Sequence, residues 1–261
     1  MKRFRIPSIL AFFLLLAVLL SAALATAANN SGQQLFDQAN KAYSAGNYQQ
    51  AIDDYLAFAD QNGVSASLLY NLANSYAASG QTGLAVVNYK RALRLAPGDG
   101  DIQANLEQVR KDAGLYRDDK PVYEQLADLL AADQWLMLAA AAFCLLAVIL
   151  LAANLAPANR KFLPIQPRLP VILTLLVITV TLPAALFRYQ AWHDGVVQGE
   201  EARLLISPFA EAASSGTIKA GRLIRPGKSH GDFVLIRDET GRSGWLHQKD
   251  FQRIAELPAV E

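Results

Sequence analysis

Residues 134–159 read QWLMLAAAAFCLLAVILLAANLAPAN and contain no charged side chain. The core of this run, from Trp135 to Leu155, matches the roughly 20 residues that a helix needs to cross about 30 Å of hydrocarbon. A second uncharged run follows at residues 169–187. The two runs predict a pair of transmembrane helices over residues 134–156 and 169–187, and a buried hairpin within a soluble fold is the alternative.

Aromatic and basic residues flank these runs as membrane anchors would. Trp135 stands at the start of the first run, and Arg188, Tyr189 and Trp192 follow the second, and such side chains gather at the level of the lipid headgroups. The whole chain has 52% hydrophobic but only 18% charged residues, which is too apolar for two ordinary soluble domains. Part of this apolar surface is therefore expected to face lipid.

The loop at residues 157–168, between the two runs, sets the expected orientation. It holds Arg160, Lys161 and Arg168 and no acidic residue, and short loops rich in Lys and Arg stay in the cytoplasm. The loop is therefore predicted to be cytoplasmic. Both regions that flank the hairpin are then expected on the outer side of the membrane.

The N-terminus has the pattern of an export signal. Basic residues precede an apolar stretch, and the small residues Ala25-Thr26-Ala27 follow it, which is the order of a secretory signal peptide. We expect a signal peptide over residues 1–27, with an uncleaved anchor as the alternative. Either version exports the chain that follows, in agreement with the charges of the loop.

Residues 32–130 contain a pattern that repeats after 34 residues. Identical residues at this spacing include Ala39 and Ala73, Asn40 and Asn74, Gly46 and Gly80, Ala51 and Ala85, and Tyr55 and Tyr89, and Asn71-Leu72 recurs as Asn105-Leu106. Alanines let two helices approach closely, and a glycine permits the turn between them. Because this period is that of the tetratricopeptide repeat, we expect an all-α domain with repeats at residues 32–65 and 66–99 and capping helices at 101–130.

Resemblance to tetratricopeptide domains implies a concave face that binds peptides and is lined by the first helix of each repeat. The residues that it places there are Phe36, Asn40, Tyr43, Tyr70, Asn71 and Asn74. Asparagine side chains can hold an extended peptide backbone, and the alternative is that they only stabilise the packing of the repeats. Phe36 and Asp101 stand where carboxylate-clamp members of the family have lysines, which argues against such a clamp.

Residues 196–254 have the short alternating runs of a small all-β domain. Turns that contain glycine separate the runs at 202–206, 216–220, 233–237 and 244–246. Their order, with the ending TGRSGWL at residues 240–246, resembles a bacterial SH3-like domain, and such domains often bind cell-wall peptides or protein segments. We expect Trp245 in the core because so small a barrel needs its large aromatic residues inside. The alternative is a ligand face formed by Phe233 and Trp245.

The histidines and the cysteine do not indicate a catalytic site. The three histidines, His193, His230 and His247, show no metal-binding or triad spacing, and the single Cys144 lies within the first apolar run. We therefore expect that the protein is not an enzyme and binds no metal or cofactor. The alternative is a cell-wall hydrolase. The net charge is only +1 and the chain has no basic stripe, so nucleic acid is not an expected partner.

The order of signal peptide, repeats, hairpin and β-domain resembles the BatE-type proteins of the bacterial aerotolerance operon over nearly the whole chain. The likeness is clearest from YNLANSY at residues 70–76, through YKRALRLAP at 89–97, to Asn105-Leu106-Glu107. The signal peptide and the loop charges predict a bacterial inner-membrane protein with N-terminal and C-terminal domains in the periplasm, and the order of domains agrees with this resemblance. The resemblance implies a membrane complex with von Willebrand A-type proteins, served by a MoxR-type ATPase and linked to oxidative-stress tolerance.

The expected function is therefore that of a non-catalytic scaffold that binds other envelope proteins. The alternative binding function is recognition of peptidoglycan by the β-domain, while the repeats recruit a cell-wall enzyme.

Overall fold

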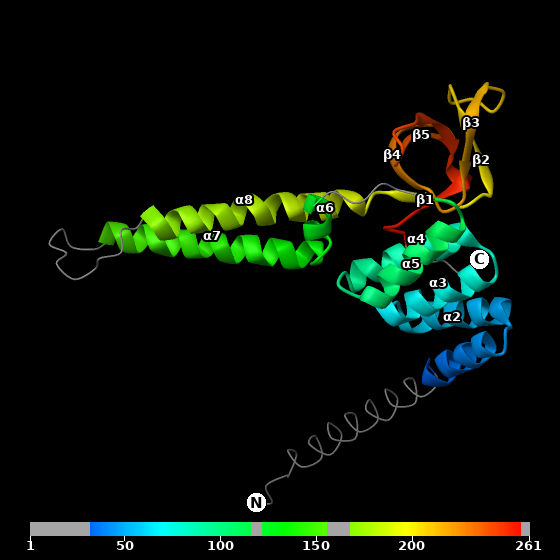
Figure 1. Ribbon diagram of the computed structural model, residues 1–261, viewed down its shortest axis with the longest axis horizontal. Coiled ribbons are helices and arrows are strands. Elements are labelled where there is room, and N and C mark those ends of the chain that lie inside the picture. Colours follow the sequence, from blue (N-terminus) through cyan, green and yellow to red (C-terminus); the bar gives the residue numbers. More distant parts are fainter. Residues whose placement is uncertain (1–31, 116–121, 156–167, 257–261) are drawn as a thin grey trace, which may run out of the picture. The chain divides into compact units, whose positions relative to one another are not determined.

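The computed structural model describes residues 32–115, 122–155 and 168–256 (Figure 1). The chain forms two compact units, residues 1–64 together with 258–261, and residues 65–257. The expected signal peptide at 1–27 and the expected loop at 157–168, apart from Arg168, lie outside the described residues. The first unit is helical where it is described, and the second holds helices, an apolar hairpin and a C-terminal antiparallel sheet.

In the first unit, a helix over residues 32–44 and helix α2 (Tyr48–Asn62) form a helical hairpin. The turn between them contains Gly46, whose φ of 79° lies in the left-handed region that suits glycine. Ala39 and Ala51 are fully buried, so the two helices approach closely. Helix α2 ends at Gly63, whose N–H donates to the carbonyl oxygen of Ala59 at 2.8 Å.

The second unit repeats this arrangement 34 residues further along the chain. Helices α3 (Ala66–Ala78) and α4 (Thr82–Leu95) are followed by α5 (Gly100–Asp112). Gly80 has a φ of 80° in the turn, and Ala73 and Ala85 are fully buried. Helix α5 begins after Asp99, whose side chain accepts hydrogen bonds from two backbone N–H groups of the first turn. The positions that match in the sequence thus have the same structural roles.

Helices α7 (Ala132–Leu155) and α8 (Arg168–Ala191) lie side by side as a long hairpin, with the short helix α6 (Val122–Ala127) at one end (Figure 1). Both long helices are of sufficient length and apolarity to cross a membrane. Helix α8 extends past its predicted end at residue 187 and stays helical through Pro183. The prediction of two long apolar helices is therefore confirmed.

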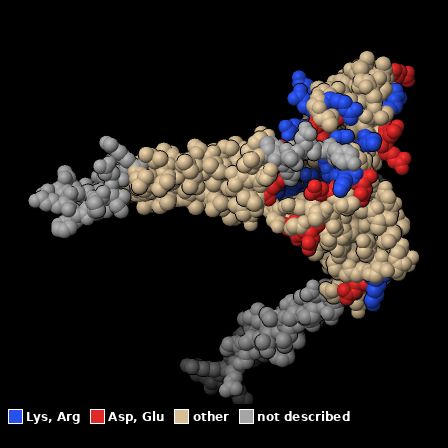
Figure 2. All heavy atoms as spheres, in the orientation of Figure 1, with Lys and Arg blue, Asp and Glu red and all other residues tan. Residues whose placement is uncertain are grey.

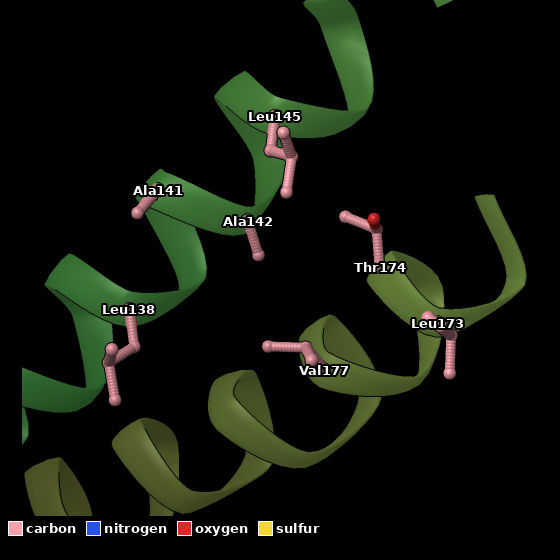
Figure 3. A pocket seen from close by; sticks show the side chains of 7 residues that line it. All are labelled: Leu138, Ala141, Ala142, Leu145, Leu173, Thr174 and Val177. Carbon is pink, nitrogen blue, oxygen red and sulfur yellow. The ribbon is translucent and has the colours of Figure 1, made fainter. Parts of the chain in front are cut away.

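The hairpin presents an apolar surface. In Figure 2 most of the length of its described part is tan, whereas Lys, Arg, Asp and Glu gather over the sheet and its neighbouring helices. A hollow of about 320 Å³ lies between α7 and α8, and Figure 3 shows the side chains that line it. Its lining consists of Leu138, Ala141, Ala142, Leu145, Leu173, Thr174 and Val177. Because the Thr174 hydroxyl donates to the carbonyl oxygen of Pro170 at 2.7 Å, the hollow offers mainly apolar surface.

Seven short strands form the C-terminal sheet. They are β1 (Gly195–Val197), β2 (Glu201–Leu205), β3 (Ser214–Lys219), β4 (Leu223–His230), β5 (Phe233–Asp238), β6 (Ser243–His247) and β7 (Phe251–Arg253), with a 3₁₀ turn η1 (Gln248–Asp250) before β7. The strand order is β3-β2-β6-β5-β4-β1-β7, and the paired strands are antiparallel. Figure 1 shows the sheet curled on itself.

A single hydrophobic core lies on the inner side of the curled sheet. All seven strands contribute to it through Val197, Ala202, Leu204, Ile218, Ile224, Val234, Ile236, Leu246 and Phe251. The expected C-terminal antiparallel sheet is confirmed, but strands β1, β4 and β7 were not predicted. Strand β4 contains Pro226-Gly227, which indicates a turn, and the structure accommodates this pair by a register shift between Pro226 and Ser229.

Candidate functional site

The first candidate surface lies on the first helix of each helical hairpin. In the first unit, the Tyr55 hydroxyl donates to Oδ1 of Asn40 at 2.6 Å. The ring of Phe36 packs against Tyr55, with centroids 5.6 Å apart, and Tyr43 packs against Tyr48 at 5.5 Å. The three predicted residues of this unit therefore pack against α2 or the turn before it, and Asn40 bonds to a buried tyrosine.

The same bond recurs in the second unit, where the Tyr89 hydroxyl donates to Oδ1 of Asn74. Asn105 of helix α5 adds two further bonds, because its Nδ2 donates to Oδ1 of Asn74 at 3.1 Å and to the Tyr70 hydroxyl oxygen at 2.8 Å. Asn71 lies half-buried on α3 beside Tyr70 in the sequence. The structure thus brings Tyr70 and Asn74 together with Asn105, which was not predicted as a site residue.

These bonds fix the orientation of the Asn74 side-chain amide. Its Oδ1 accepts from both Tyr89 and Asn105, while its Nδ2 donates to none of the described residues. The amide is half-buried. Asn74 therefore has the packing role that was the alternative interpretation of these asparagines. Its side-chain N–H groups can also donate to an acceptor on a bound molecule.

The second candidate surface is the outer side of the sheet. Strand pairing places His230 opposite Phe233 and Phe233 opposite His247, and in the next row Leu235 opposite Trp245. The rings of Phe233 and His247 are 5.2 Å apart. Phe209, which is 59% exposed, packs on His230 at 5.9 Å. We call the set Phe209, His230, Phe233, Leu235, Trp245 and His247 the aromatic face.

The position of Trp245 corrects the expectation that it packs in the core. Its neighbours Gly244 and Leu246 are buried, whereas Trp245 is only half-buried. Side chains alternate between the two sides of a strand, so only every second residue of β6 can point inward. A Cβ on Gly244 would lie 2.6 Å from Cγ of Leu204, which shows how little room the inner side has. The structure therefore places both Phe233 and Trp245 on the outer side.

Helix α4 is tied to the sheet by a buried arginine. Arg91 is only 2% exposed, and its guanidinium donates to the carbonyl oxygens of Arg253 at 3.2 Å and Ile254 at 3.4 Å. Burial lowers the pKa of Arg91 to about 10, so the group still carries its charge at neutral pH. Residues 163 positions apart in the sequence are thus joined inside one unit.

Further contacts strengthen the junction of helices and sheet. Arg110 of α5 donates to both carboxylate oxygens of Glu239, at 2.7 and 2.8 Å. Gly83 of α4 lies so close to β1 that a Cβ there would be 2.6 Å from the carbonyl oxygen of Val197. The junction therefore combines a charge-assisted ion pair with close backbone packing.

Two tryptophans expected as membrane anchors make contacts inside the protein. Trp135 is buried, and its Nε1 donates to the carbonyl oxygen of Ala127 at 3.0 Å. Trp192 is half-buried, and the Arg94 guanidinium lies 4.1 Å from its ring centroid, a favourable cation–π geometry. Tyr189 remains exposed at the end of α8.

Asp238 organises the turn between β5 and β6. Its buried carboxylate accepts from the N–H of Thr240 at 3.0 Å, and from the N–H and Nε of Arg242 at 2.9 and 2.8 Å. Burial alone would raise the pKa of Asp238, but the hydrogen bonds from Thr240 and Arg242 outweigh it and hold the pKa below its usual value.

The histidines and the cysteine lie in three different parts of the fold. His230 and His247 belong to the aromatic face, His193 packs its ring against Tyr189, and Cys144 is an exposed residue of α7. Within residues 32–115, 122–155 and 168–256, no group of three or more His, Cys, Asp or Glu residues is arranged to hold a metal ion.

A comparison with models of known protein families gives no match, and a comparison with curated proteins gives none either. Inference about function therefore rests on the two candidate surfaces and on the apolar hairpin.

Proposed function

We propose that this protein is a non-catalytic scaffold of the bacterial inner membrane that binds other envelope proteins in the periplasm. The observation that carries the proposal is the aromatic face. Phe209 is 59% exposed there, beside the half-buried side chains of Phe233 and Trp245. Exposed clusters of aromatic residues mark surfaces that bind other molecules, and rings supply contact area at little cost in conformational entropy.

The first candidate surface, on the first helix of the helical hairpins, supports the same function. Asn74 offers a side-chain N–H donor next to the Tyr70 and Asn105 pair, which suits the carbonyl oxygens of an extended peptide. We propose that the helical pairs are tetratricopeptide repeats and that the sheet is an SH3-like domain. The repeat of the tyrosine–asparagine bond after 34 residues favours the first of these assignments.

The combination of repeats, hairpin and small β-domain leads us to propose kinship with the BatE-type proteins. On that proposal, the partners are membrane proteins with von Willebrand A-type domains, and the complex is linked to oxidative-stress tolerance. Peptidoglycan is the alternative ligand of the aromatic face.

Crosslinking from the aromatic face in living cells tests the binding function. With a photoreactive phenylalanine analogue in place of Phe209 of the full chain, we expect adducts with one or a few envelope proteins. The same analogue at Thr217, which is exposed on β3, is the matched control and is expected to give none of these adducts. Adding Trp245→Ala to the Phe209 variant should reduce the yield severalfold, because it removes a ring from the same surface.

Two outcomes would contradict the binding of envelope proteins. One is an equal adduct pattern at Phe209 and Thr217. The other is retention of the full-length protein on purified peptidoglycan that is lost in Trp245→Ala, without protein adducts, which would favour the cell-wall alternative. Hydrolysis of peptidoglycan by the purified protein that disappears in His230→Ala or His247→Ala would establish the enzyme alternative.

Reporter fusions test the proposed topology. Fusions at Asp118, Lys161 and Lys228 are expected to report the periplasm, the cytoplasm and the periplasm, because the positive loop is retained inside. An external signal at Lys161 would overturn the orientation, and three equal signals would overturn the membrane-spanning hairpin itself.

A further inference from the structure

Helix α6 packs against the end of the apolar hairpin through one of its sides. Ala127 and the neighbouring Leu130 share a small core with Trp135, Ala184 and Ala185. The ring of Tyr123 meets Phe187 edge to face, with centroids 5.8 Å apart. Asp128, just beyond α6, forms an ion pair with Arg188 at 2.8 Å. These contacts fix the position of α6 along α8.

A second group of apolar side chains on this segment points away from the hairpin core. Val122 is 80% exposed, Leu126 39% and Leu129 62%. Their spacing of four and three residues places them on one side of a helix, and the helical hydrogen bonding continues past α6, since the N–H of Asp128 donates to the carbonyl oxygen of Glu124 at 2.9 Å. Glu124, Gln125 and Asp128 occupy the remaining part of the circumference.

The apolar side of α6 and the turn after it is therefore wider than the part of that side that contacts the hairpin. At 100° per residue, Leu129, Val122 and Leu126 are followed directly by Leu130, Tyr123 and Ala127, which make that contact. The exposed apolar side chains of α6 thus border the side that contacts the hairpin, whose own residues Leu186 and Leu136 are also exposed.

The contacts of α6 also determine its depth in a membrane. Ala184 and Phe187 belong to the last turn of the apolar run, and Arg188 is the first charged residue after it. A helix rises about 1.5 Å per residue, so the residues of α8 that α6 touches lie within roughly 6 Å of Arg188 along the axis. If α8 crosses a bilayer, this is the level at which acyl chains meet headgroups.

We infer that α6 and the turn after it form an interfacial anchor, with Val122, Leu126 and Leu129 inserted into the outer boundary of the bilayer beside the hairpin. The occupant of this apolar strip is lipid, and Glu124, Gln125 and Asp128 lie on the opposite, polar side of the helix, as in amphipathic helices that lie in the membrane plane. The inference rests on the proposed membrane-spanning hairpin, and it adds a third contact with the membrane.

Spin labels in nanodiscs of phosphatidylethanolamine and phosphatidylglycerol test the anchor. In the full-length Cys144→Ala protein, single cysteines replace Leu126, Leu129 or Gln125, and Val148 and Lys228 provide references for the middle of α7 and for the exposed side of the sheet. Labels at Leu126 and Leu129 are expected to give a ratio of oxygen to nickel-chelate accessibility several times higher than the label at Gln125, and between the values of the references.

The outcomes separate the anchor from the hairpin. If Val148 is deep in lipid but Leu126 and Leu129 match Gln125 and Lys228, the anchor is wrong and the hairpin stands. If the Val148 label also reports water, the proposed membrane span itself fails.

Discussion

Gly83→Ala is expected to push helix α4 away from strand β1 and to weaken their contact by about 2 kcal/mol, the usual scale for overpacking. A Cβ there would lie 2.6 Å from the carbonyl oxygen of Val197 and 2.8 Å from Cα of Gln198. Both are backbone atoms, so neither can rotate out of the way. The Val197 oxygen also accepts from the N–H of Gly221 at 2.8 Å, and this bond should weaken. Hydrogen exchange of the full-length protein in detergent should show faster exchange at Gly221.

Gly100→Ala is the matched control for this substitution. Gly100 also stands at the start of a helix, α5, but a Cβ there meets nothing within 4 Å. Since alanine favours a helix over glycine by up to about 1 kcal/mol, this variant should be neutral or slightly more stable. Unchanged exchange at Gly221 in Gly83→Ala would show that the close approach of α4 and β1 is not required.

Asp238→Ala is expected to open the turn between β5 and β6 and to destabilise the sheet by about 3 kcal/mol, because the donors of Thr240 and Arg242 lose a buried charged acceptor. The N–H of Asp238 itself donates to the carbonyl oxygen of Arg242 at 2.9 Å, so exchange at this amide reports the opening directly. Asp232→Ala, at the other end of β5, is the control. Asp232 is exposed, and its side chain bonds to none of the described residues.

The effect of Asp238 should depend on pH in one direction. Because the folded protein holds the pKa of Asp238 below its usual value, the unfolded chain takes up the proton first as the pH falls. The carboxylate therefore contributes its full stabilisation above the unfolded pKa of about 4 and loses it as the pH drops through the lower folded value. Hydrogen exchange in wild type and Asp238→Ala should converge in acid, and a difference that grows in acid would contradict this assignment.

The repeat spacing and the apolar runs predicted the parts of the fold that depend on local patterns. Ala39 and Ala73 are fully buried, since close helix packing needs a small residue at each equivalent position. The hairpin follows from length and hydropathy alone. Such features are encoded in contiguous sequence, which explains why they could be recognised.

Other features depend on contacts between distant residues and could not be predicted. A lone arginine on a helix suggests an exposed side chain, yet Arg91 is buried because the carbonyl oxygens of Arg253 and Ile254 meet it. Trp245 is a different case, because it was assigned to the core by its size although the local alternation with Gly244 and Leu246, which are buried, places it outside. Phe209 joins the aromatic face only through its packing on His230.

The connection between α8 and β1 limits the distance between the sheet and the end of helix α8. Helix α8 ends at Ala191 and β1 begins at Gly195, and so short a link spans at most about 14 Å when fully extended. In the proposed topology the aromatic face is confined to a thin layer above the bilayer. Confinement of this kind raises the effective concentration of any ligand that is itself attached to the membrane. It therefore favours membrane-bound partners over freely diffusing ones without any additional contact.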